Sequence, residues 1–131
     1  MLATARIHHV AIICSDYERS KKFYHELLGF EIIAEHYRAE RQSYKLDLQV
    51  GACQIELFSF PDPPRRVTGP EACGLRHLAF EVDNVAEVLR FLRDNGVEAE
   101  DVRVDEYTGK RFTFFRDPDD LPLEIYESSV V

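Results

Sequence analysis

A repeat at a spacing of 68 residues constrains this chain more than any other feature of its sequence. His9 and Glu56 recur at that spacing as His77 and Glu124. The flanking sequence is repeated as well, because the tetrapeptide His-Val-Ala-Ile at residues 9–12 corresponds to His-Leu-Ala-Phe at residues 77–80. A chain that repeats two polar residues inside apolar segments has duplicated one module. Each half then carries one imidazole and one carboxylate at matching positions.

Each half shows the same order of elements, one strand, one helix and then three strands. In the first module, about residues 5–60, we expect strands at 7–13, 30–37, 44–50 and 53–60 and a helix from a cap at Ser15 or Asp16 to Gly29. In the second, about residues 75–128, we expect strands at 75–82, 97–104, 111–116 and 122–127 and a helix from a cap at Asn84 to Gly96. Residues 61–74, which contain a Pro-rich stretch, form the linker. The pattern predicts an α+β fold of two tandem βαβββ modules.

Length and composition favour one domain spanning residues 1–131. A chain of this length with 45% hydrophobic residues can bury about two-thirds of its unfolded surface, whereas one module alone is too small for a stable core. We therefore expect the modules to pair around a pseudo-twofold axis. The net charge of −8 argues against nucleic acid or an anionic membrane as a partner.

The three cysteines and the absence of a long apolar run indicate the compartment. Cys14, Cys53 and Cys73 are odd in number and lack CxxC spacing, so we expect reduced, mostly buried thiols. No stretch approaches the length of a membrane span, and the N-terminus lacks the apolar core of a signal peptide. These features predict a cytoplasmic protein.

Strand alternation places the repeated residues on one kind of sheet face. His9 shares a face with Ala11 and Ile13, and Glu56 with Gln54 and Phe58, while their neighbours face the helix layer. The second module repeats this arrangement. Two imidazoles and two carboxylates suit one divalent metal ion such as Zn, Ni, Co, Fe or Mn. The carboxylates offset the charge of the ion, and a free coordination position would let it polarise a substrate oxygen.

The alternative is that these residues have no shared role. A single histidine or glutamate in a strand is usually a structural or surface group, and a duplication with little drift would leave two inert pairs. Matching positions in both modules favour the metal site. Surface or packing roles are expected for His25 and His36, and for His8, which alternation places on the opposite face from His9. The pair Lys110-Arg111 either attracts an anionic substrate or marks an exposed strand end.

The chain resembles the vicinal oxygen chelate superfamily, and within it the glyoxalase I-like (lactoylglutathione lyase-like) proteins. The resemblance spans essentially the whole chain. The residues that carry it are His9, Asp16, Ser20, Phe23-Tyr24, Leu28-Gly29-Phe30, Glu56, Gly74-Leu75-Arg76-His77, Asp117-Pro118-Asp119 and Leu123-Glu124. It implies the glyoxalase/bleomycin-resistance/dioxygenase fold, in which paired βαβββ modules curve around a divalent metal. It also implies a small-molecule substrate and a homodimer, with the site built either within one chain or across two.

By the same resemblance, the metal ligands are His9, Glu56, His77 and Glu124. Both glutamates are candidate catalytic residues, and Glu124 best matches the base that transfers the proton. The implied reaction is an isomerisation, in which the metal polarises vicinal oxygens and the base removes a carbon-bound proton to give an enediolate. Glu56 favours this branch, because extradiol dioxygenases and fosfomycin thiol transferases typically lack a carboxylate there.

Two positions depart from bacterial glyoxalase I. Where that enzyme typically has an Arg and an Asn that serve glutathione, this chain has Ile13 and Phe60, which cannot pair with a carboxylate. The resemblance therefore implies a metal-dependent isomerase or lyase that acts on a small carbonyl compound, and these two positions leave the use of glutathione open. The alternatives are another metalloenzyme of the superfamily, such as an Fe(II) extradiol dioxygenase, and a non-catalytic binding protein of the bleomycin-resistance type.

Overall fold

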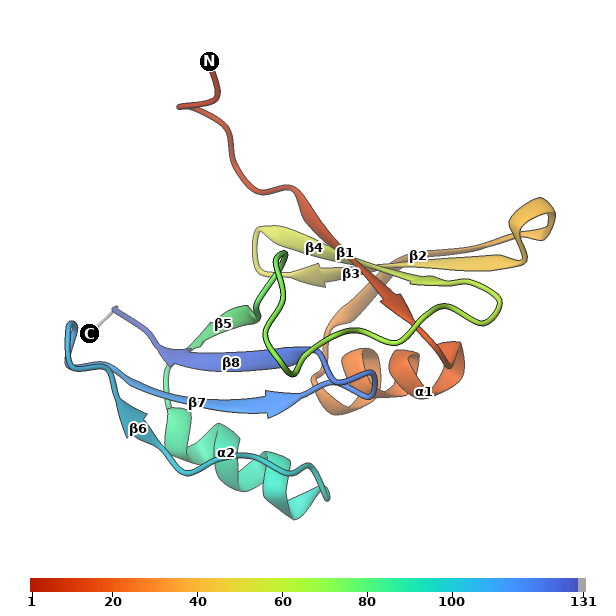
Figure 1. Cartoon of the computed structure of the whole chain (residues 1–131). Helices are drawn as coiled ribbons and strands as arrows, with labels where there is room; N and C mark the ends of the chain where they lie inside the picture. Colours follow the sequence, from red (N-terminus) through yellow and green to blue (C-terminus); the bar gives the residue numbers. More distant parts are fainter. Residues whose placement is uncertain (130–131) are drawn as a thin grey trace. The chain divides into compact units, whose positions relative to one another are not determined.

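The chain forms two compact units with one four-stranded sheet each. The computed structural model describes residues 1–129, and one unit comprises residues 1–65 while the other begins at Arg66 (Figure 1). Both units have the order strand, helix and three strands. The predicted α+β architecture of two βαβββ modules is therefore confirmed. No helix among residues 1–129 is long and apolar enough to cross a membrane.

In the first unit the sheet has the strand order β1-β4-β3-β2, with β1 parallel to β4. Its elements are β1 (His9–Cys14), α1 (Tyr17–Lys21), a π-helical segment (Lys22–Leu27), β2 (Glu31–Arg38), a 3-10 turn (Ala39–Arg41), β3 (Ser43–Val50) and β4 (Cys53–Ser59). In the second unit the order is β5-β8-β7-β6, with β5 parallel to β8. Its elements are β5 (Leu78–Val82), α2 (Val85–Asp94), β6 (Arg103–Val104), β7 (Arg111–Arg116) and β8 (Pro122–Glu127).

One face of each sheet packs on the helix of its own unit. In β4, Ile55 and Leu57 are buried, and Leu123 and Ile125 are their counterparts in β8. The residues between them are only partly buried. This period of two confirms the alternation expected from the sequence, and it leaves Glu56 on the face away from the helix.

The first helix differs from the expected one. Asp16 caps it, because its carboxylate accepts a hydrogen bond from the backbone N–H of Arg19 at 3.1 Å. After α1, however, the chain continues as a π-helical segment, in which the N–H of Leu28 donates to the carbonyl of Phe23 at 2.9 Å. The wider turn accommodates two consecutive buried rings, Phe23 and Tyr24.

Two expected strands are shorter than predicted, because side chains take up their backbone groups. The strand expected at 75–82 begins at Leu78, and the Arg66 guanidinium donates to the carbonyls of Leu75 and Arg76 at 2.6 and 3.2 Å. The strand expected at 97–104 is reduced to β6 and an isolated antiparallel bridge between Ala99 and Phe115. Between them, the Thr113 hydroxyl donates to the carbonyl of Glu100 at 2.6 Å. A carbonyl bonded to a side chain is less available for a sheet ladder.

An ion pair on the helix side of the first sheet should make the stability of the protein depend on pH. Glu35 accepts hydrogen bonds from the Lys21 ammonium at 2.7 Å and from the Tyr17 hydroxyl. The bond from Lys21, followed by that from Tyr17, lowers the pKa of Glu35 below its ordinary value. We expect Glu35→Gln to destabilise the protein near neutral pH by less than about 1 kcal/mol, since the pair is partly exposed.

This difference should depend on pH with a definite sign. Because folding lowers the pKa of Glu35, the stabilisation is fully present above the unfolded pKa and disappears as the pH falls through the folded value. Urea unfolding of both proteins at a series of pH values checks this, with exposed Glu40 changed to Gln as the control. A destabilisation by Glu35→Gln that stays constant from neutral to acid pH would contradict the assignment.

Candidate metal and catalytic site

In the first unit, the predicted ligands His9 and Glu56 lie together. They come from the neighbouring parallel strands β1 and β4, and the register pairs Ala11 with Glu56. The Nδ1 atom of His9 lies 3.4 Å from the carboxylate of Glu56. The Glu56 side chain is 13% exposed and the His9 side chain 42%, so the pair is open to solvent on the imidazole side.

The second unit brings His77 and Glu124 together in the same way. Glu124 pairs in register with Ala79 of β5, and His77 directly precedes that strand. The Nε2 atom of His77 lies 3.8 Å from the carboxylate of Glu124, whose side chain is also 13% exposed. The repeated spacing in the sequence thus corresponds to a repeated side-chain pair.

Each pair has a geometry that fits two ligands of one metal ion. Two donor atoms at about 2.1 Å from a tetrahedral or octahedral ion lie about 3.0–3.4 Å apart. The separation of 3.4 Å in the first unit lies at the upper end of this range, and that of 3.8 Å in the second requires only a small side-chain adjustment to reach it. Among residues 1–129, no group of three or more His, Cys, Asp and Glu side chains is placed to hold a metal. The four-ligand site therefore stays a prediction to which each unit contributes two ligands.

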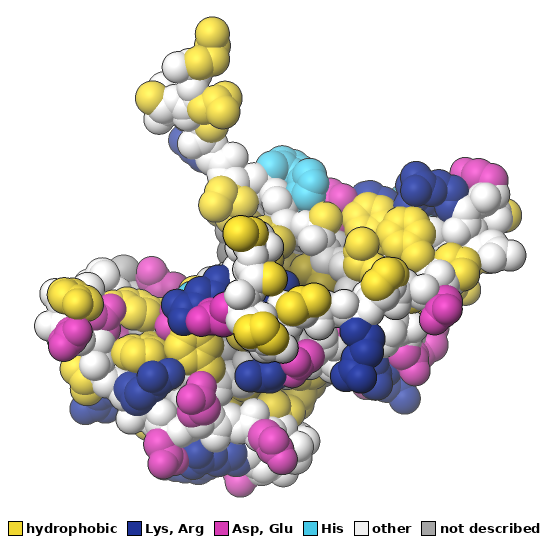
Figure 2. Space-filling model, viewed as in Figure 1, with side chains coloured by type: hydrophobic (Ala, Val, Ile, Leu, Met, Phe, Trp, Pro, Cys, Tyr) yellow, Lys and Arg dark blue, Asp and Glu magenta, His cyan; other side chains and the backbone are white. Residues whose placement is uncertain are grey.

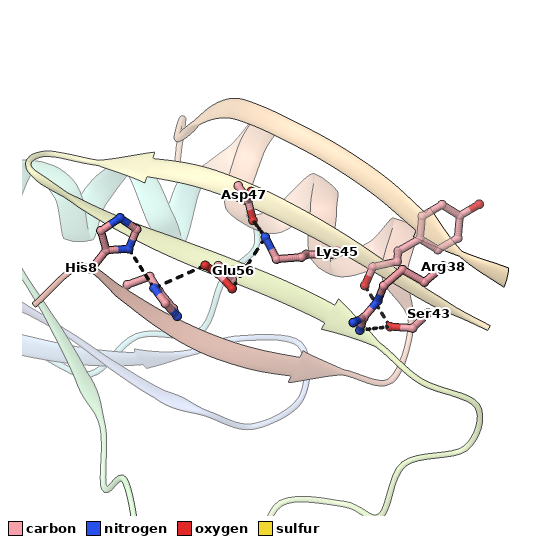
Figure 3. A network of polar contacts seen from close by, with 8 residues as sticks. His8, Arg38, Ser43, Lys45, Asp47 and Glu56 are labelled. Atoms are coloured by element: carbon pink, nitrogen blue, oxygen red, sulfur yellow. Dashed lines mark hydrogen bonds and ion pairs between the residues drawn. The ribbon is translucent and has the colours of Figure 1, made fainter. Parts of the chain in front are cut away.

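The two glutamates have different neighbours. Across β3, Asp47 pairs in register with Glu56, and the Lys45 ammonium lies 3.8 Å from Glu56 and 2.7 Å from Asp47 (Figure 3). Across β7, Phe114 pairs in register with Glu124. Glu56 thus lies beside an ammonium and a second carboxylate, whereas Glu124 lies opposite an aromatic ring, with Asp105 and Arg103 acting on it electrostatically.

The aromatic surroundings of Glu124 alter its acidity. The ring of Phe114 contacts the His77 imidazole edge to face, with centroids 5.1 Å apart. Burial raises the pKa of the Glu124 carboxyl above its ordinary value, and the nearby His77 opposes this effect. A carboxylate with a raised pKa is a stronger base than one in water, which is the property that a proton-transfer residue needs.

The prediction that His8 faces away from His9 was wrong. That residue precedes β1, so the regular alternation of a strand does not extend to it. Its Nδ1 lies 2.9 Å from the Nδ1 of His9, close enough for one imidazole N–H to donate to the other. Both residues are exposed, and imidazole is visible at the surface in the space-filling view (cyan in Figure 2). His8 is therefore a direct neighbour of the candidate site.

The sequence did not single out Lys45 and Asp47 for the site, although a signal for them was present. The strands expected at 44–50 and 53–60 leave a two-residue turn, Gly51-Ala52, and such a turn pairs the residues on either side of it, Val50 with Cys53. Counting back along the two strands from this pair places Asp47 opposite Glu56. The register that follows from this turn therefore predicts that Asp47 neighbours Glu56.

The remaining candidates lie apart from the two pairs. His25 has a packing role, with Nδ1 2.7 Å from the carbonyl oxygen of Phe30, and His36 is exposed. The Lys110 ammonium donates to the Ser128 carbonyl at 3.3 Å. The structure confirms that the cysteines are free, but of the three only Cys14 is buried.

Known proteins with similar sequences and structures identify the family. The Glyoxalase/Bleomycin resistance protein/Dioxygenase superfamily model matches residues 6–125. The uncharacterized protein YwkD of Bacillus subtilis (strain 168) is 63% identical over 122 residues, which cover 92% of this chain and 95% of YwkD. The crystal structure of the glyoxalase family protein from Enterococcus faecalis is 51% identical, with a TM-score of 0.87 and coverage of 94% of this chain and 98% of that one.

A more distant relative is named as a metal-dependent enzyme. Metallothiol transferase FosB of Staphylococcus saprophyticus subsp. saprophyticus is 25% identical over 126 residues, covering 95% of this chain and 78% of FosB. The family match covers nearly the whole chain and agrees with the two βαβββ units. The chain therefore belongs to the Glyoxalase/Bleomycin resistance protein/Dioxygenase superfamily, also called the vicinal oxygen chelate superfamily.

Proposed function

We propose that this protein is a divalent-metal-dependent isomerase or lyase of the glyoxalase type that acts on a small carbonyl compound. The observation that carries the proposal is the repeated His–Glu pair, with nitrogen–oxygen separations of 3.4 and 3.8 Å on equivalent strands. FosB supports the metal, because its name describes a metal-dependent transferase in the same superfamily.

The four ligands of this proposal are His9, Glu56, His77 and Glu124. Imidazole and carboxylate together suit Zn, Ni, Co, Fe or Mn, and two carboxylates offset the charge of the dication. Two complementary halves, from one chain or from two copies in a homodimer, supply the complete set. The metal, when bound, acts as a Lewis acid that polarises the substrate oxygens.

Within this site, Glu124 is the base. Its carboxyl has a pKa raised by burial, while Glu56 lies 3.8 Å from the Lys45 ammonium and is held within a polar network. When two carboxylates of one site lie in contrasting environments, one commonly accepts a proton while the other binds or stabilises charge. Glu124 would remove a proton from the carbon beside the substrate carbonyl and return it to the neighbouring carbon.

Metal analysis of protein purified without chelators tests the proposal. We expect a stoichiometric divalent metal, and we expect the unfolding temperature to fall on chelation and to recover when the metal is restored, since a ligand that binds only the folded state stabilises it. Protein with no stoichiometric metal and no response to added metal would exclude both an isomerase and an Fe(II) dioxygenase. That outcome would leave a binding protein of the bleomycin-resistance type.

The use of glutathione can be tested with a single carbonyl compound. Ile13 is 55% exposed, and Phe60 stacks on Phe58 with ring centroids 6.2 Å apart. Because both side chains are hydrocarbons, neither offers a hydrogen-bond donor for glutathione. We therefore expect the metal-loaded enzyme to isomerise the hydrate of methylglyoxal, which carries a hydrogen and a hydroxyl on the carbon beside the ketone, at least as fast as the glutathione hemithioacetal. A strong preference for the hemithioacetal would show that other residues bind glutathione.

A further inference from the structure

Arg38 ends β2 on the same sheet face as the His9–Glu56 pair. It pairs in register with Ser43, which alternates with Lys45 and Asp47 along β3. Figure 3 shows Arg38 and Ser43 beyond Lys45 on this face. The Arg38 guanidinium lies over the ring of Phe58, 5.4 Å from its centroid. This ring fixes the position of the guanidinium by a cation–π contact.

The hydrogen-bonding capacity of Arg38 is largely unused by the protein. Its Nη2 donates to the hydroxyl of Ser43 at 3.3 Å. Its Nε is buried and has no hydrogen-bond partner among residues 1–129. Lys45 on the same face pairs with Asp47 at 2.7 Å, whereas the part of the chain that the structure describes places no carboxylate within ion-pair distance of Arg38.

A partly buried cation of this kind favours an anion. A buried charge without a partner costs free energy, and an unpaired buried N–H adds to that cost. The planar guanidinium fork matches the oxygens of a carboxylate or a phosphate. Phe58 follows Glu56 by two residues, a rise of about 7 Å along β4, so an anion bound by the guanidinium over the Phe58 ring lies on the same sheet face as Glu56 and about 7 Å or more from it.

We propose that Arg38 binds an oxyanion group, a carboxylate or a phosphate, on the substrate of this protein. The inference rests on the proposed function in that it assigns the anion to the same substrate. It also narrows the class of substrate to a small carbonyl compound that carries an anionic group. A guanidinium at Arg38 then provides anion recognition on a face where Ile13 and Phe60 provide none.

NMR of the metal-free protein tests this with two probes, inorganic phosphate and acetate, at constant ionic strength. We expect the Arg38 Nε–H signal, assigned by its loss in Arg38→Lys, to move saturably with at least one probe, and the responding probe identifies the kind of anion. Binding followed through the amides of Ser43 and Lys45 should weaken by at least about tenfold in Arg38→Gln. The control is Arg90→Gln, which removes the same charge from the exposed side of α2 and should change the affinity less than twofold.

A signal of Arg38 that neither probe moves, or equal binding by Arg38→Gln and the wild type, would overturn the inference. Equal losses in Arg38→Gln and Arg90→Gln would also overturn it, because they would indicate a general effect of charge. Since the protein is metal-free in this experiment, a failure of the Arg38 site is distinguishable from a failure of the proposed metal enzyme, which the metal analysis measures.

Discussion

Turnover of the carbonyl substrate should fall by a factor of about 10² to 10⁴ when Glu124 is replaced by glutamine, the range typical for loss of a positioned general base. Glutamine keeps the size of the side chain but cannot accept the proton. Glu124 is the carboxylate with the raised pKa, opposite the Phe114 ring on β7. The rate constant kcat, expressed per bound metal ion, measures the effect apart from any loss of metal.

The matched control is the same change at Glu56. That carboxylate lies beside Lys45 and Asp47, and we assign it to metal binding rather than to proton transfer. Glu56→Gln should therefore weaken metal binding and reduce kcat per bound metal less than Glu124→Gln does. Unchanged turnover in Glu124→Gln would remove it as the base, and a larger loss in Glu56→Gln would assign that role to Glu56.

Replacing His9 or His77 by alanine should weaken divalent-metal binding by at least about a hundredfold, because even outer-shell partners of a metal ligand commonly contribute about 10- to 100-fold. Each imidazole is one of the two proposed ligands in its unit, with its nitrogen 3.4 Å (His9) or 3.8 Å (His77) from the carboxylate of the other. Competition with a chelating dye measures the affinity. His36→Ala, at an exposed position in β2, removes an imidazole without touching either pair and should leave the affinity unchanged.

Equal effects in the two halves would support one ion held by both pairs. If His9→Ala abolished binding while His77→Ala left it unchanged, the metal would belong to the first unit alone, and the neighbouring His8 would become a candidate ligand. A metal affinity that neither substitution changes would exclude the proposed site.

The sequence predicted the parts of this molecule that depend on local periodicity. Alternation correctly placed Ile55 and Leu57 in the core and Glu56 on the opposite face. The duplication did the same for the second module, because residues at equivalent positions of two copies of one fold have equivalent surroundings. The spacing predicted Asn84 as one cap and either Ser15 or Asp16 as the other, and in the structure Asn84 and Asp16 cap the helices.

What the sequence did not reveal depends on contacts between residues that are distant in the chain. The strand expected at 75–82 begins only at Leu78, because Arg66 donates hydrogen bonds to the carbonyls of Leu75 and Arg76. The different surroundings of Glu56 and Glu124 could not be predicted either, because they come from the neighbouring strands β3 and β7 and not from the repeated sequence. Arg38 was missed because its strand was predicted to end at Tyr37, one residue too early.

The parallel pairing of β1 with β4, and of β5 with β8, has a consequence for how metal binding would respond to partial unfolding. In each module the two proposed ligands are 47 residues apart in the chain and come from its start and its last strand. Such a pair forms only when the helix and both intervening strands are in place, unlike ligands that neighbour each other on one helix or hairpin. Any local opening of a module would separate its two ligands, so metal affinity would measure the intactness of the whole module.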